Sequence, residues 1–188
     1  MDKFAKIIRI ISIPPLLAFL AATLLFFFRD GFFAGWLDYA VVLLTLVILP
    51  ILPYPISLVK PKEKRREFQR STAIVFSVIG YILGALFAFV TNAPVTEKIF
   101  FSAYLLSGIA IAIASFVIKK KASGHTCGIS GPITLLTCFL NIKSAFLYFL
   151  LIPVCYASVK LKRHTLPQLI SGALIPIASI ALSFLIFM

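Results

Sequence analysis

The stretch STAIVFSVIGYILGALFAFVT, residues 71–91, decides the fold class of this chain. None of its side chains is charged, and at about 1.5 Å per residue it reaches across a hydrocarbon core of about 30 Å. It follows directly on the basic run KPKEKRREFQR, residues 60–70. An uncharged apolar run beside a basic cluster predicts a membrane-spanning helix whose first turns lie at a charged interface.

Composition extends this prediction to the whole chain. The 188 residues are 61% hydrophobic and 13% charged, with a mean hydropathy of +1.08. Soluble domains are usually about 45–50% apolar and about 25% charged. These values exclude an ordinary soluble domain and a disordered chain. They predict a single integral membrane domain over residues 1–188.

The apolar runs predict an all-α, polytopic membrane helix bundle. We place seven crossings, with six as the alternative, at about residues 7–28, 36–59, 71–91, 98–118, 126–140, 144–160 and 166–187. The first is predicted to be an anchor, because no small-residue cleavage site follows a short apolar core. Pro50, Pro53 and Pro55 predict a kinked or unwound end of the second. The fifth is short for a full crossing, which keeps six as the alternative.

The basic residues gather on one side of this predicted bundle. Of the 18 Lys and Arg residues, 15 lie at the N-terminus or in the loops near residues 60–70, 119–125 and 160–165. Alternating crossings place these segments on one face, which we call side A, and leave Arg29, Lys98 and Lys143 on side B. The positive-inside rule predicts that side A is cytoplasmic, in the inner or plasma membrane of a prokaryote.

Both histidines lie on side A, each beside a basic cluster and just before a predicted helix. The two stretches are KKKASGH, residues 119–125, and KLKRHTLPQ, residues 160–168. A helix start offers free backbone N–H groups and a positive dipole end, which favour an anion. Thr165 is predicted to be the N-cap of the last helix. Gln168, four residues after His164, is predicted to orient its imidazole.

Many cations, two imidazoles and few carboxylates together suit phosphate chemistry. Cations neutralise phosphate oxygens, one imidazole attacks phosphorus, and the other protonates the leaving oxygen. The same face suits a metal site poorly, because its only acids are Asp2, Glu63 and Glu67 and it has no cysteine ligands. The sequence therefore predicts no metal, no cofactor and no nucleic-acid partner. The predicted partners are membrane lipids and a lipid phosphate substrate.

Two of these stretches resemble motifs of the type 2 phosphatidic acid phosphatase superfamily, which are membrane lipid phosphatases. Ser123, Gly124 and His125 resemble its second motif, a Ser-Gly-His at the start of a helix. The run RHTLPQ, residues 163–168, resembles a divergent third motif and is similar to that of a bacterial branch with a His-Thr-x-x-Gln pattern. The resemblance covers roughly residues 60–175.

The resemblance implies a function and roles for particular residues. It implies that His164 is the nucleophile that forms a phosphohistidine, that His125 is the general acid, and that Gln168 takes the orienting position. The neighbouring groups expected to bind phosphate are Lys121, Ser123, Gly124, Arg65, Arg66 and Arg163. The implied reaction is metal-independent hydrolysis of a lipid phosphate such as phosphatidate, phosphatidylglycerophosphate or a polyprenyl (di)phosphate.

The sequence also departs from the family pattern. The family's arginine six residues before the nucleophile falls on Ser158, its preceding serine falls on Ala157, and Gln168 replaces the orienting aspartate. The first motif has only an approximate counterpart within residues 60–68. These departures keep two alternatives open, namely an inactive membrane protein that binds lipid phosphates and a small transporter.

Overall fold

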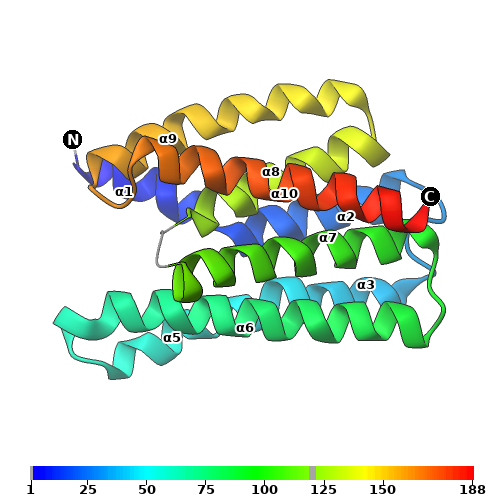
Figure 1. The fold of residues 1–188 in the computed structure, drawn as a ribbon, viewed down its shortest axis with the longest axis horizontal. Helices are drawn as coiled ribbons and strands as arrows, with labels where there is room; N and C mark the ends of the chain where they lie inside the picture. The colour runs from blue at the N-terminus through cyan, green and yellow to red at the C-terminus, as the bar shows by residue number, and fades with distance from the viewer. Residues whose placement is uncertain (1, 119–121) are drawn as a thin grey trace.

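The computed structural model describes residues 2–118 and 122–188, and within these ranges it contains helices and no strand. Figure 1 shows the long helices running side by side while the chain reverses direction at the two ends of the bundle. The N-terminus lies at one end and the C-terminus at the other. The predicted fold class, an all-α polytopic membrane bundle, is confirmed.

The first part of the chain forms a bent helix pair and a broken helix. α1 (Asp2–Ile11) and α2 (Pro14–Phe28) are bent by 40° relative to each other. The broken helix consists of α3 (Trp36–Val42), the π-helix η1 (Leu43–Ile48), α4 (Leu49–Ile51), α5 (Pro53–Ile56) and the 3-10 helix η2 (Ser57–Val59). Its interruptions coincide with the proline-rich end, where each proline removes a backbone donor, as predicted.

The remaining elements are longer. They are α6 (Lys62–Val90), α7 (Val95–Ala112), the π-helix η3 (Ile113–Val117), α8 (Gly124–Phe139), the 3-10 helix η4 (Ile142–Leu150), α9 (Leu151–Lys160) and α10 (Leu166–Phe187). α10 packs against α7 and α8, α6 packs against α7, and α1 packs against α9. The two ends of the chain therefore contribute neighbouring walls of the same bundle.

The number of spans is the point on which the structure refines the prediction. Within residues 2–118 and 122–188, five segments are long and apolar enough to cross a membrane, and the α1–α2 pair makes a sixth if it forms one span. The segment predicted as the fifth crossing, α8, has 16 residues. That is shorter than the roughly 20 a crossing needs. α8 contacts α2, α7 and α10, which shield its backbone from lipid.

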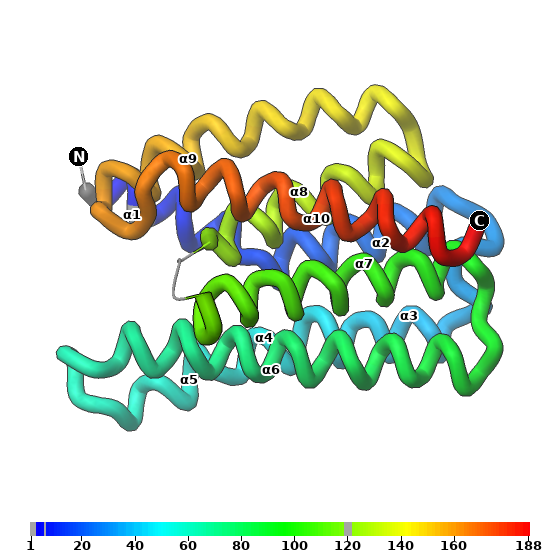
Figure 2. Tube along the Cα trace, viewed as in Figure 1, coloured from blue at the N-terminus to red at the C-terminus, as the bar shows by residue number. Residues whose placement is uncertain are grey.

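The connections between helices group at two ends, as the charge pattern predicted. The N-terminus, the α5–α6 turn and the α9–α10 turn lie at one end (Figures 1 and 2). The α2–α3, α6–α7 and α8–η4 connections lie at the other end with the C-terminus. The basic segments assigned to side A that the structure describes therefore lie at one end of the bundle.

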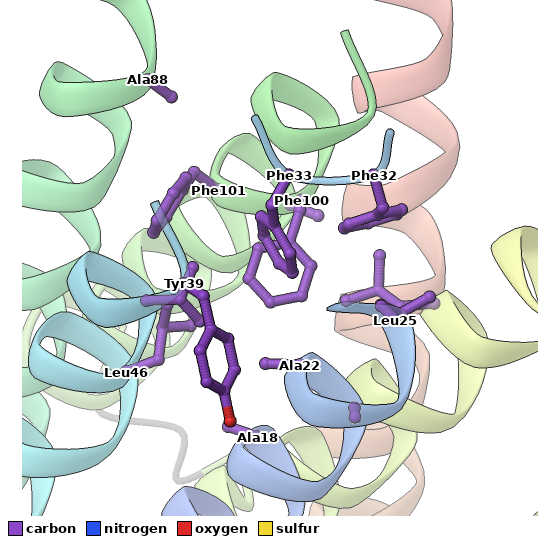
Figure 3. Close-up of a cluster of buried hydrophobic side chains, with 14 of the residues drawn as sticks. Ala18, Ala22, Leu25, Phe32, Phe33, Tyr39, Leu46, Ala88, Phe100 and Phe101 are labelled. Atoms are coloured by element: carbon purple, nitrogen blue, oxygen red, sulfur yellow. The ribbon is translucent and has the colours of Figure 1, made fainter. Parts of the chain in front are cut away.

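A buried aromatic cluster holds the side B half together. Phe32 and Phe33, between α2 and α3, meet Phe100 and Phe101 of α7 (Figure 3). All four are at most 6% exposed. Their rings meet edge to face with centroids 4.8–5.9 Å apart, the arrangement that aromatic pairs prefer. This packing lies at the side B end, because Phe32 and Phe33 belong to the α2–α3 connection.

Candidate functional site

A cavity of about 700 Å³ receives side chains from both histidine stretches. We call it the central cavity. Its polar lining includes both histidines and six cations, namely Arg9, Lys62, Arg65, Arg66, Arg70 and Arg163. No carboxylate is among the lining residues in the part of the chain that the structure describes. The site is therefore strongly basic.

The central cavity continues from this basic region into the apolar interior of the bundle. Its lining follows α8 from Gly124 to Leu135 and reaches Ile180 on α10. At about 1.5 Å per residue, His125 and Leu135 are about 15 Å apart along α8. The inner wall is largely apolar and aromatic and includes Tyr104 of α7. Its lining fits a ligand that joins an anionic group to an apolar body.

The helix that contains His125 and the helix that follows His164 are joined at their N-terminal ends. The backbone N–H of Ser123 donates to the Gln168 carbonyl at 2.9 Å. The Thr126 hydroxyl donates to the Leu169 carbonyl, also at 2.9 Å. These bonds connect the N-terminal end of α8 to the first turn of α10, so the segments that carry the two imidazoles are held next to each other.

Gly172 permits this close approach of α8 and α10. A Cβ at Gly172 would lie 2.5 Å from the Thr126 hydroxyl oxygen and would also clash with the Ser123 carbonyl oxygen. We expect Gly172→Ala to lower the free energy of unfolding by about 1–3 kcal/mol, as overpacking usually does. Thermal unfolding in detergent measures this. Gly35→Ala is the control, because a Cβ there meets nothing within 4 Å, and equal midpoints for the two variants would contradict the prediction.

Hydrogen bonds determine which nitrogen of His164 is free. The Gln168 side-chain oxygen accepts from the backbone N–H of Thr165 at 3.3 Å and lies 3.2 Å from Nδ1 of His164. Because the backbone N–H can only donate, the shared atom is the oxygen, and Nδ1 must carry the proton. The lone pair of the neutral ring is then on Nε2. Thr165 and Gln168 also form the capping box of α10, so Gln168 has a structural role as well.

Helix α1 orients the second imidazole. The Ser12 hydroxyl donates to the Ile8 carbonyl at 2.7 Å, and its oxygen lies 3.0 Å from Nε2 of His125. Because the single hydroxyl proton is used by Ile8, the His125 ring donates to Ser12 from Nε2. Nδ1 is then the nitrogen that remains available to accept a proton.

Burial and neighbouring cations keep both imidazoles neutral at pH 7. Burial is the main cause that lowers the pKa of His125 to about 3, and the positive charge of Arg9, with that of His164 when it is protonated, adds to it. Burial also lowers the pKa of His164, reinforced by nearby arginines and opposed by its hydrogen bond to Gln168. A neutral imidazole is the form that can act as a nucleophile or base.

The lowered pKa of His125 predicts a loss of stability in acid. The pKa is about 3 in the folded protein and 6.5 ordinarily, so the unfolded chain binds more protons between these values. The contribution is complete above pH 6.5 and declines toward pH 3 by up to about 1.4 kcal/mol per pH unit. Thermal unfolding in detergent at pH 7, 6 and 5 tests this. The decline should be smaller in His125→Gln, and parallel curves for the two proteins would contradict it.

Arginines surround the histidines from several elements. Arg66 and Arg70 come from α6, Arg163 precedes α10, and Arg9 comes from α1. Arg66 lies within electrostatic range of Arg163 and Arg70, and Arg9 within range of Arg163 and Arg66. The side-chain hydrogen bonds of Arg9 and Arg70 go to serine hydroxyls. Like charges collected in one cavity repel one another, and a bound anion would relieve that repulsion.

Most of the predicted site residues line the central cavity, but not all of them do. Those that line the central cavity are His125, His164, Gly124, Arg65, Arg66 and Arg163. Gln168 contacts His164 from behind. Lys121 lies outside the described residues. Arg65 also donates to the carbonyls of Leu58 and Lys60 at 3.0 and 3.3 Å, so part of its guanidinium is used at the α5–α6 turn.

Ser123 was predicted to bind phosphate, but its side chain does not line the cavity. Its side chain is fully buried and is not part of the cavity lining. Its hydroxyl accepts from the backbone N–H of Thr126 and caps α8, while its own N–H is used by Gln168. Its N–H is thus used by the α8–α10 junction and its hydroxyl by the N-terminus of α8, so Ser123 supports the site without lining the cavity.

Sequence reasoning missed the contribution of α1. Arg9 and Ser12 belong to a segment that was interpreted as an anchor, and Arg70 was interpreted as part of a topology signal. Arg9 interrupts the apolar run IIRII, residues 7–11. An arginine inside a membrane segment is a functional candidate by default, so the signal was present.

A buried serine of α9 contacts Arg9. Ser158 is fully buried and accepts a hydrogen bond from the Arg9 guanidinium at 2.7 Å. An arginine of α1 is therefore held by a side chain of α9.

The described residues do not form a metal-binding cluster. Among residues 2–118 and 122–188, no three His, Cys, Asp or Glu side chains lie close enough together to hold a metal ion. No protein-family model matches this chain, and neither the curated proteins nor the solved structures contain a match to it.

Proposed function

We propose that this protein is a membrane lipid phosphatase that hydrolyses a lipid phosphomonoester or diphosphate through a phosphohistidine at His164. One observation supports this above the others. The central cavity combines two neutral imidazoles and several arginines with an apolar interior, and none of its described lining residues is a carboxylate. The arginines can form charge-assisted hydrogen bonds to the phosphate oxygens, and the apolar walls can enclose a hydrocarbon chain.

The first step uses the free Nε2 of His164. Its lone pair attacks phosphorus, an N–P bond forms, and the bond from phosphorus to the lipid oxygen breaks with its electron pair. The hydrogen bond from Nδ1–H to Gln168 holds the ring in the tautomer that this attack requires. Arg66 and Arg163 bind the phosphate oxygens, on which negative charge is spread in the transition state.

His125 supplies the proton for the leaving lipid oxygen. It is neutral in the empty site, so it must gain a proton when the substrate binds. A phosphate brings negative charge that favours the imidazolium, and a phosphate monoanion can itself donate the proton. After the lipid alcohol leaves, neutral His125 accepts a proton from water as the water attacks phosphorus. The N–P bond then breaks and inorganic phosphate is released.

The same site predicts where the substrate lies in the membrane. The basic segments at the side A end support a cytoplasmic face under the positive-inside rule. We propose that the headgroup enters there and that the tail extends along the apolar part of the cavity. Phosphatidate, phosphatidylglycerophosphate and polyprenyl (di)phosphates all combine these two parts.

A phosphate-release assay on purified protein in detergent with EDTA tests this proposal. Wild-type protein should release phosphate from at least one of these lipid phosphates and release far less from glycerol 3-phosphate, which lacks the tail. Lys143→Ala, on side B, is the control and should match wild type. Release no greater than that of a protein lacking both histidines would reject the phosphatase. Binding of the lipid phosphate without release would favour the inactive lipid-phosphate-binding protein.

A further inference from the structure

We infer that helix α1 contributes to ligand binding at this site and that Arg9 binds the phosphate of the ligand. The inference rests on the proposed function, because it assigns a residue to the same phosphate site. It gives the first membrane segment a role beyond anchoring the chain.

α1 is held firmly beside the site. Ala5 and Ile8 are 1% and 8% exposed and share a buried cluster with Val154 and Ala157 of α9. This packing turns one face of α1 toward α9. Ser12, one turn beyond Ile8, contacts His125 directly. The end of α1 is thus attached both to the bundle and to one of the two imidazoles.

Arg9 reaches the site from this helix. Its side chain lines the central cavity, and one terminal nitrogen donates to the buried Ser158 hydroxyl at 2.7 Å. A guanidinium has five N–H donors. That bond to Ser158 is the one side-chain hydrogen bond of Arg9 within the described part of the chain, so four donors remain for a ligand. Ser158 therefore fixes the guanidinium and leaves most of it free.

The charges around Arg9 indicate the chemistry of that ligand. Arg163 and Arg66 are its charged neighbours, and both are cations. Positive groups converging on one cavity favour an anion that several of them can share. The planar guanidinium matches two oxygens of a phosphate at once, which a lysine cannot do. Arg9 is thus suited to binding a phosphate monoester between α1 and α6.

Binding of inorganic phosphate to detergent-solubilised protein, measured by calorimetry, tests the role of Arg9. Arg9→Gln removes the charge and keeps a donor for Ser158, and it should raise the Kd at least about tenfold. Lys3→Gln is the matched control, because it makes the same change at an exposed position of α1, and its Kd should stay within about twofold of wild type. Arg9→Lys keeps the charge without the fork, and should fall between them.

A second arm compares mixed micelles that carry phosphatidate with micelles that carry diacylglycerol. Arg9→Gln should weaken binding of phosphatidate by the same factor and leave diacylglycerol unaffected, because only the phosphate is recognised. Wild-type affinity in Arg9→Gln, or no phosphate binding by wild type, would overturn the inference. If Arg9→Gln does not fold, Arg9→Lys decides, and equal Kd values for Arg9→Lys and wild type would overturn it.

The outcomes separate this inference from the proposed function. Phosphate binding that depends on Arg9, in a protein that releases no phosphate from any lipid tested, would reject the phosphatase and leave the role of Arg9 intact. If phosphate release and the Kd for phosphate are both unchanged in Arg9→Gln, the role of Arg9 is rejected and the phosphatase is retained.

Discussion

Replacing His164 by alanine is expected to reduce phosphate release from a lipid phosphate at least about 10⁴-fold. The residue is the proposed nucleophile, and removal of a nucleophile usually costs that much or more. The arginines remain in this variant, so phosphate binding should persist within a few-fold. Loss of release together with retained binding distinguishes loss of the chemical step from loss of folding.

Substitutions of Gln168, which orients His164, are expected to reduce phosphate release to different degrees. Gln168→Ala removes the oxygen that holds Nδ1–H of His164, and it also removes half of the capping box of α10. Gln168→Glu keeps an acceptor at the same place. Release should therefore fall more in Gln168→Ala than in Gln168→Glu. Release by His164→Ala at the wild-type rate would show that His164 is not the nucleophile.

Filling the apolar part of the central cavity is expected to have the second-largest effect, and it should depend on the substrate's tail. Ser107 of α7 lines this part and is 6% exposed. Ser107→Phe should exclude several methylenes of the tail, each contributing about 0.8 kcal/mol. Excluding two to five of them lowers kcat/KM for a long-chain lipid phosphate by about tenfold to 10³-fold. Hydrolysis of a very short-chain analogue should change little.

The control for this variant lies on the same helix. Ile109 is 39% exposed and is not part of the cavity lining. Ile109→Phe should therefore leave kcat/KM for both substrates near the wild-type values. If Ser107→Phe lowered the rate equally for long and short chains, the tail would not occupy the cavity.

Local features of the site were predictable because they depend on residues close in sequence. Gln168 was predicted to orient His164, and the structure has them in contact, because the Gln168 side chain in the first turn of α10 reaches back past the N-cap Thr165. Thr165 was predicted as the N-cap and caps α10. The apolar runs likewise located the membrane segments except the predicted fifth crossing, α8, because length and hydropathy decide them.

Features that depend on how distant segments pack were not predictable. Arg9 and Ser158 are 149 positions apart and meet only because α1 docks against α9. The backbone N–H of Ser123 bonds to the Gln168 carbonyl only because α10 packs against α8, which the sequence does not reveal. The interior position of α8 has the same origin, since its neighbours and not its own length supply its surroundings.

The central claim, a covalent phosphohistidine at His164, is tested most directly by trapping the phosphorylated protein. Wild-type protein is mixed with a radiolabelled lipid phosphate substrate and quenched within one turnover under alkaline conditions, in which phosphohistidine survives. The label is then located by mass spectrometry. We predict one phosphoryl group on His164 of wild type and none in His164→Ala. Phosphate release without any label on the protein, or label on another residue, would contradict the account.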